Sequence, residues 1–167
     1  MSAHIVKSIA ELRQWRKQQG GKSIGFVPTM GALHQGHRSL LQQARQENDV
    51  LALSIFVNPT QFAEGEDLDS YPQQYNEDIE LAEEAGVDCI WFGDKAECYP
   101  ADFATEIQLP TLANLLCGES RPHHFGGVAV IVLKLFNLFQ PHVAYFGEKD
   151  FQQLSIICQL VKDLHLE

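Results

Sequence analysis

A glycine-containing stretch with two histidines is the first part of the sequence whose residue types indicate chemistry. The segment "PTMGALHQGH" (28–37) follows a short apolar run and leads into a helical pattern. Gly31 and Gly36 carry no side chain, so backbone N–H groups and the positive end of the helix dipole can approach an anion. His34 and His37 then share one face of the helix start. The dipole disfavours imidazolium in the absence of a ligand, whereas a bound phosphate favours it. The stretch therefore predicts either phosphate binding or two capping or core histidines.

A second stretch, "YFGEKDFQQ" (145–153), also runs from a strand pattern into a helix pattern. Lys149 lies where it opposes the helix dipole, which costs about 0.3–1 kcal/mol at an exposed site. A bound anion would offset that cost, and the alternative is that the side chain points into water. Asp150 and Gln153 also fit a capping pair. The stretch predicts a second contact with an anionic ligand.

Two further stretches carry polar groups beside strand or helix patterns. In "FVNPTQF" (56–62), Gln61 offers a donor and an acceptor to a small polar substrate, or is a turn residue. In "SRPHHFGGV" (120–128), Arg121, His123 and His124 form either a basic site or a solvated loop. Together with the two stretches above, they predict a nucleotide polyphosphate that lies across two helix N-termini.

The surrounding elements follow from hydrophobic periodicity. Short apolar runs predict strands over 23–27, 50–57, 87–92 and 143–146. Helical spacing predicts five longer helices. The first follows the capping box of Ser8 and Glu11, and the second follows "HQGH". The third starts at Tyr75, has an acidic outer face and ends at Gly86 as its C-terminal cap, and the last two span 127–141 and Leu154 to Leu164. Residues 94–126 read as irregular, with one short helix near "TLANLL". Strands that alternate with helices predict an α/β fold with a doubly wound parallel sheet, in which the loops above lie at the strand carboxyl ends.

Length and composition exclude several classes of protein. The 167 residues fit one domain, and a net charge of -10 argues against nucleic acid or an anionic membrane as a partner. No apolar run approaches the roughly 18 residues of a membrane span, and no signal peptide is recognisable, so we expect a cytoplasmic protein. The four cysteines show no metal-binding spacing, so reduced, mostly buried thiols are expected rather than a zinc site.

At "VPTMGALHQGH", "IFVNPTQF", "SRPHHFGGV" and "FGEKDFQQ", in this order and spacing, the chain resembles the pantothenate synthetase (pantoate–β-alanine ligase) family. The resemblance covers essentially all residues. It implies the Rossmann-like fold of the nucleotidylyl-transferase superfamily, whose HxGH motif is His34 to His37. It also implies that ATP and Mg²⁺ are used to join pantoate to β-alanine through pantoyl adenylate, in a homodimer without nucleic-acid or membrane partners.

The resemblance also implies roles for individual residues. ATP would contact Met30, Gly31, Ala32, Leu33, His34, Gln35, Gly36 and His37, together with Gly147, Glu148, Lys149 and Asp150. His37, His34 and Lys149 would be catalytic at the phosphates, with His37 as the candidate general acid and Asp150 near the ribose. Gln61 and Gln153 would bind pantoate, and Gln61 would border β-alanine.

Family members continue beyond the length of this chain into a further strand, a mobile loop resembling the KMSKS element, and a smaller C-terminal domain. The resemblance implies that residues 1–167 are the N-terminal ATP- and pantoate-binding domain without that C-terminal domain. We therefore expect weak ligand binding and poor turnover. Two alternatives stay open: a catalytically silent domain for ligand binding or dimerisation, and another HxGH nucleotidylyl transferase.

Overall fold

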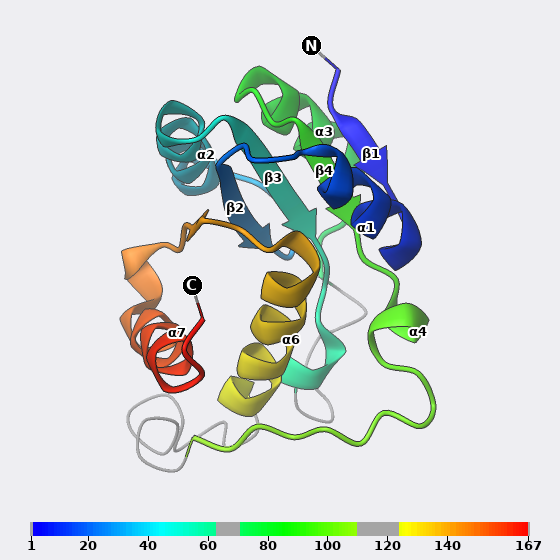
Figure 1. Cartoon of the computed structure of the whole chain (residues 1–167), viewed down its shortest axis with the longest axis vertical. Coiled ribbons are helices and arrows are strands. Elements are labelled where there is room, and N and C mark those ends of the chain that lie inside the picture. Colours follow the sequence, from blue (N-terminus) through cyan, green and yellow to red (C-terminus); the bar gives the residue numbers. More distant parts are fainter. Residues whose placement is uncertain (1, 63–70, 110–123, 167) are drawn as a thin grey trace.

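The computed structural model describes residues 2–62, 71–109 and 124–166. Its centre is a five-stranded sheet in the order β1-β4-β3-β2-β5, in which every described pairing is parallel. The strands are β1 (His4–Val6), β2 (Ile24–Thr29), β3 (Val50–Ile55), β4 (Cys89–Phe92) and β5 (Val143–Ala144). The predicted doubly wound parallel sheet is confirmed (Figure 1).

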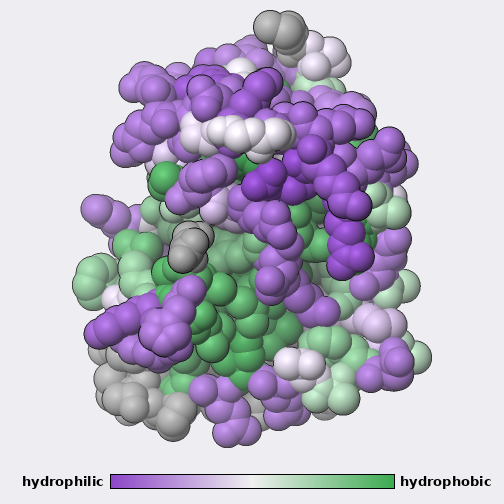
Figure 2. Space-filling model, in the orientation of Figure 1, coloured by the Kyte–Doolittle hydropathy of each residue, from purple (hydrophilic) through white to green (hydrophobic). Residues whose placement is uncertain are grey.

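Helices cover both faces of the sheet. On one face, α1 (Ile9–Gln18) and α6 (His124–Phe139) pack over a core that includes Trp15, Phe26, Trp91 and Phe139. On the other face, α2 (Gln35–Glu47) and α3 (Tyr75–Glu84) cover a second core. The last helix, α7 (Phe151–Asp163), packs beside α6 (Figure 1). Figure 2 shows an apolar area where Figure 1 places α6, with hydrophilic residues above it.

The strand order creates a switch point beside β2. From β2 the chain passes to β3 and then to β4 on one side, and it returns through α6 to β5 on the other side of β2. In open parallel sheets, ligands bind outside the carboxyl ends of the strands at such a point. The HxGH stretch follows β2, and the segment 147–150 follows β5.

Several local predictions are confirmed. Ser8 and Glu11 form the predicted capping box of α1, and Gly86 adopts a positive φ of 81° directly after Ala85, the C-cap of α3. Cys89 and Cys98 are buried reduced thiols, and burial raises their pKa to about 12 and about 11, whereas Cys158 is exposed. In the part of the chain that the structure describes, no helix has the length and apolar character to cross a lipid bilayer.

Other local predictions are wrong. The sequence patterns missed β1 and a short helix α4 (Lys95–Cys98), and α6 includes His124, three residues before the predicted start. The last strand stops at Ala144 because the pairing with β2 ends there, with one further hydrogen bond from Tyr145 N to Phe26 O (2.9 Å). The short helix predicted near residues 111–116 lies outside the described residues, as do Cys117, Arg121 and His123.

Candidate functional site

The two histidines of the HxGH motif cap the helix that they begin. His34 is the N-cap of α2, and its Nδ1 accepts a hydrogen bond from the backbone N–H of Gly36 (3.1 Å). His37 Nδ1 accepts from the backbone N–H of His34 (3.3 Å), which completes a capping box. The two ring centroids are 4.1 Å apart. The predicted capping role is confirmed, and it fixes both rings.

Among the residues that the structure describes, no hydrogen bond engages the other ring nitrogen, Nε2, of either histidine. A nitrogen that accepts a backbone N–H carries no proton, so each neutral ring carries its proton on Nε2. Burial and the neighbouring His34 imidazole lower the pKa of His37, while Asp78 acts in the opposite direction. The lowered pKa favours the neutral form of His37, and in the neutral form each ring presents an Nε2–H donor, an arrangement that suits hydrogen bonding to phosphate oxygens.

A buried carboxylate that the sequence patterns missed holds the turn before these histidines. Asp78 is only 1% exposed, and its carboxylate accepts the backbone N–H groups of Ala32 (3.0 Å) and Leu33 (2.6 Å). The predicted acidic outer face of α3 is present, since Glu77, Glu80 and Glu84 are exposed, whereas Asp78 lies on the buried side of the helix. Its spacing of four residues from the buried Ala82 places it on the inward side of α3, although nothing in the sequence indicates its partners.

Gln61 lies in a short 3₁₀ turn, η1 (Pro59–Gln61), and both the nitrogen and the oxygen of its side-chain amide have a partner. Its Nε2 lies 3.0 Å from Met30 Sδ, and its Oε1 accepts from Asn58 Nδ2 (3.2 Å). Its backbone oxygen lies 2.8 Å from His124 Nδ1. The structure therefore brings together the predicted residues Met30 and Gln61, and it joins His124 to them.

Asn58 and Tyr99, which the sequence patterns also missed, hold Gln61 in place through hydrogen bonds. Tyr99 donates to Asn58, and Asn58 donates to Gln61. Asn58 is 1% exposed, and its Oδ1 accepts from the hydroxyls of Tyr99 (2.7 Å) and Thr60 (3.0 Å). Its Nδ2 also donates to the Gly127 carbonyl of α6 (3.2 Å). A polar residue directly after the apolar run of β3 was the signal for Asn58, while nothing in the sequence marked Tyr99.

The segment after β5 places Lys149 and Asp150 in a 3₁₀ turn, η2 (Glu148–Asp150), and Gln153 in the first turn of α7. The side chain of Asp150 makes no cap hydrogen bond, so the predicted capping pair with Gln153 is wrong. Among the described residues, no hydrogen bond or ion pair engages the side chains of Lys149, Asp150 and Gln153. Lys149 and Asp150 are exposed and Gln153 is half-buried, so these side chains are available to a ligand.

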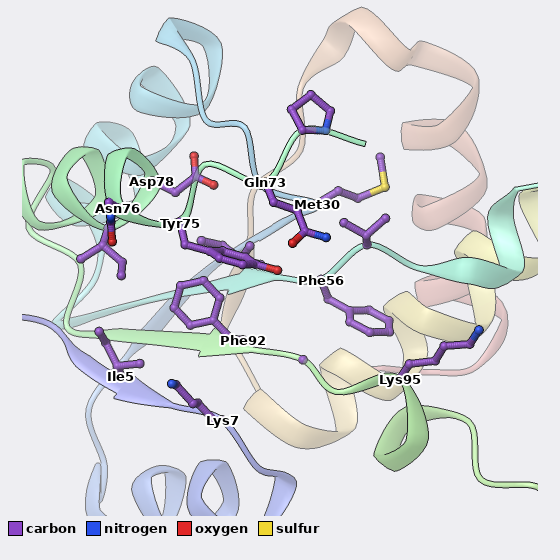
Figure 3. A pocket seen from close by; sticks show the side chains of 16 residues that line it. Ile5, Lys7, Met30, Phe56, Gln73, Tyr75, Asn76, Asp78, Phe92 and Lys95 are labelled. Carbon is purple, nitrogen blue, oxygen red and sulfur yellow. The ribbon is translucent and has the colours of Figure 1, made fainter. Parts of the chain in front are cut away.

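A cavity of about 550 Å³ opens beside the HxGH turn, at the carboxyl ends of β1, β3 and β4. Figure 3 shows Tyr75, Asn76 and Asp78 reaching it from α3, with Phe92 below them. Of the predicted site residues, Met30 and Gly31 line this cavity, whereas His34, His37, Gln61, Lys149 and Gln153 do not. The cavity and the predicted phosphate site are therefore neighbours separated by the Gly31 turn.

Comparison with known proteins identifies the family. The sequence model of the Pantoate-beta-alanine ligase family matches residues 4–167. Pantothenate synthetases from Aquifex aeolicus and Caldicellulosiruptor bescii are 53% and 51% identical over 97% and 98% of this chain. The chain spans 58% of the length of both curated relatives.

Two solved structures share the fold. The pantothenate synthetase from Thermus thermophilus superposes with a TM-score of 0.92 at 46% identity, over 98% of this chain and 58% of that one. The pantoate-beta-alanine ligase from Francisella tularensis, solved with beta-gamma ATP and beta-alanine, has a TM-score of 0.94 at 43% identity, over 98% of this chain and 64% of that one. The fold is that of nucleotidylyl transferases, and the chain belongs to the pantoate–β-alanine ligase family.

Proposed function

We propose that this chain binds ATP and pantoate for the ATP-dependent condensation of pantoate with β-alanine. Pantoate's carboxylate attacks the α-phosphorus of ATP, pyrophosphate leaves, and pantoyl adenylate forms. The β-alanine amine then attacks the acyl carbon, and AMP leaves. The observation that carries the proposal is the paired capping of His34 and His37, which leaves two Nε2–H donors at the switch point of a fold shared with an ATP-complexed relative.

The ATP site would combine the two stretches on either side of the switch point. Backbone and side chains from Met30 to His37 would contact the phosphates, and Gly147 to Asp150 would complete the site, with Lys149 near the phosphates and Asp150 near the ribose. Displacement at phosphorus needs chiefly positioning and stabilisation of the charge on the phosphate oxygens. His34, His37 and Lys149 would supply that stabilisation, and His37 would be the general acid.

Gln61 and Gln153 would bind pantoate's hydroxyl and carboxylate. Because Asn58 Nδ2 donates to Gln61 Oε1, the amide nitrogen of Gln61 is directed towards Met30 and the HxGH turn. Gln61 would also border the β-alanine position. The oriented amide supports a site that recognises a small polar molecule, since a free side chain would lose more rotamer entropy on binding.

Magnesium would accompany ATP. In the described ranges, no group of three His, Cys, Asp or Glu side chains is arranged to hold a metal ion. This fits Mg²⁺, which keeps several waters and is held mainly by substrate phosphates and one or two carboxylates.

Exchange of labelled pyrophosphate into ATP tests the proposal. Pantoate-dependent exchange by this chain would support adenylate formation, and His37→Gln should reduce it by about 10²-fold. His165→Gln, which changes an exposed histidine after α7, is the matched control and should leave the rate unchanged. Ligand binding without exchange would instead favour a silent binding domain, and exchange that needs a different nucleotidyl acceptor would favour another HxGH transferase.

We further propose that residues 1–167 form one Rossmann-like ATP- and pantoate-binding domain that acts in the cytoplasm as a homodimer. This part of the proposal follows from the family resemblance. Sedimentation of the chain at several concentrations tests the dimer, and a monomer throughout would contradict it.

A further inference from the structure

The carboxylate of Asp78 is buried in an unusual way. Among the described residues, neither ion pair includes it, and no lysine or arginine lies within salt-bridge distance. Both of its oxygens instead face the turn before α2, where Oδ2 accepts from Ala32 N and Oδ1 accepts from Leu33 N. A buried charge is stable only when its hydrogen-bonding capacity is met. The carboxylate of Asp78 is therefore stabilised by the backbone N–H groups of this turn.

The turn that Asp78 holds is conformationally strained. Gly31 has a φ of 90°, and Ala32 has a φ of 51°, which L-residues other than glycine and asparagine rarely adopt. Such a conformation persists only where the surroundings impose it. A Cβ on residue 31 would lie 3.0 Å from Asp78 Oδ2, so glycine allows the carboxylate to approach this closely.

The strained turn leads directly into the two imidazoles. Leu33, whose N–H makes the shorter bond to Asp78, precedes the N-cap His34. The N–H of His34 in turn donates to His37 Nδ1. A continuous path of hydrogen bonds and backbone therefore runs from α3 to both rings. Asp78 also acts on His37 electrostatically, because its charge favours the imidazolium form, opposite in sign to His34.

We propose that Asp78 is a positioning residue of the proposed adenylation site, which fixes the strained turn at residues 31–33 and thereby aims both imidazole Nε2–H groups at the ligand phosphates. This inference rests on the proposed function for its ligand. It assigns the buried carboxylate a role in orienting the donors, beyond joining α3 to the loop.

The test compares two isosteric changes. Asp78→Asn keeps the shape but replaces one accepting oxygen with an NH₂ group that faces a backbone N–H. Asp49→Asn is the matched control, because Asp49 also accepts a backbone N–H, from Ser23 (2.9 Å), at the opposite end of β2. Both variants remove one negative charge from a carboxylate that accepts a backbone N–H. The Ser23 N–H and hydroxyl both donate to Oδ2 of Asp49, so an asparagine there can keep these bonds, whereas Asp78 uses both oxygens and must lose one bond. The control therefore measures the effect of a lost charge away from the turn.

The first measurement is the imidazole titration of this chain by NMR, with the His37 signal assigned through His37→Gln. Asp78→Asn should lower the His37 pKa and shift both ring signals, while Asp49→Asn should leave them unchanged. Should Asp78→Asn fold poorly, the double variant Ala32→Gly/Asp78→Asn removes the unfavourable φ at residue 32, and the same fall in the His37 pKa is expected. Unchanged ring signals in a folded Asp78 variant would overturn the inference.

The second measurement is the pantoate-dependent exchange rate. Asp78→Asn should reduce the maximal rate about 10- to 100-fold with a smaller change in the half-saturating pantoate concentration, because small misplacement of donors affects the reaction more than binding. If Asp49→Asn reduced the maximal exchange rate equally, the effect of Asp78→Asn would reflect a general loss of stability, and the positioning role would be refuted. If the wild-type chain shows no exchange while Asp78→Asn still shifts the ring signals of both histidines at alkaline pH, where both rings are neutral, the proposed function fails and the positioning role stands.

Discussion

Replacing Gly127 with alanine should destabilise this protein, although alanine is the better helix former. Gly127 lies inside α6, at its contact with the η1 turn that carries Gln61. A Cβ at residue 127 would lie 2.4 Å from the carbonyl oxygen of Thr60 and 2.6 Å from its carbonyl carbon. Backbone atoms cannot rotate away as a flexible side chain can. Either α6 or η1 must therefore move.

The magnitude follows from opposing contributions. Helix propensity alone favours alanine by about 0.8–1.0 kcal/mol. Insertion of a methyl group into a closely packed contact costs about 1–3 kcal/mol. Separation of α6 from η1 also weakens the bond from Asn58 Nδ2 to the Gly127 carbonyl, for a further loss of about 1 kcal/mol. The expected net loss is about 1–3 kcal/mol, and each kcal/mol lowers the Tm of a chain this size by about 2–4 °C.

Urea denaturation followed by tryptophan fluorescence measures this loss, because Trp91 is fully buried. Gly21→Ala is the matched control: a Cβ on residue 21 meets no atom within 4 Å, so the control should be unchanged or slightly stabilised. Gly127→Ala should also weaken pantoate binding more than ATP binding, since Asn58 orients Gln61. A Gly127→Ala variant as stable as wild type would refute the close contact between α6 and η1.

Two further predictions concern the site. The pKa of His37 is lowered in the folded protein, so the unfolded chain takes up this proton first, and the folded protein loses stability as the pH falls below the ordinary histidine pKa of about 6.5. Urea denaturation at a series of pH values should show a smaller loss for His37→Gln, and parallel pH curves would contradict this. Tyr99→Phe removes the 2.7 Å hydrogen bond to Asn58 Oδ1, which should cost about 1 kcal/mol and weaken pantoate binding in calorimetric titration. Tyr75→Phe, at an exposed tyrosine, is the control, and equal pantoate affinity in both variants would count against a role of Tyr99 behind Gln61.

The sequence predicted those features that rest on local patterns. The apolar run of β3 and the capping box of α1 are examples, because burial on both faces and reciprocal capping each leave a fixed residue pattern. β1 left no such pattern, because it has only three residues and its one pairing among the described strands is with β4. The sequence patterns missed the roles of Asp78 and Tyr99 because their hydrogen-bond partners are distant in the sequence. Asp78 accepts from backbone N–H groups and Tyr99 donates to the buried amide of Asn58, and only the folded chain brings these groups together.

The structure also changes the reason for the two glycines in the HxGH stretch. Their absence of side chains was attributed to the approach of an anion. A Cβ on residue 36 would lie 2.9 Å from His34 Cε1, so glycine there makes room for the capping imidazole. Gly31 makes room in the same way for the Asp78 carboxylate. Capping and phosphate binding are thus not competing explanations of the motif. Because Gly36 admits the His34 ring and the caps occupy both Nδ1 atoms, the intramolecular bonds themselves leave each Nε2–H as the donor for a ligand.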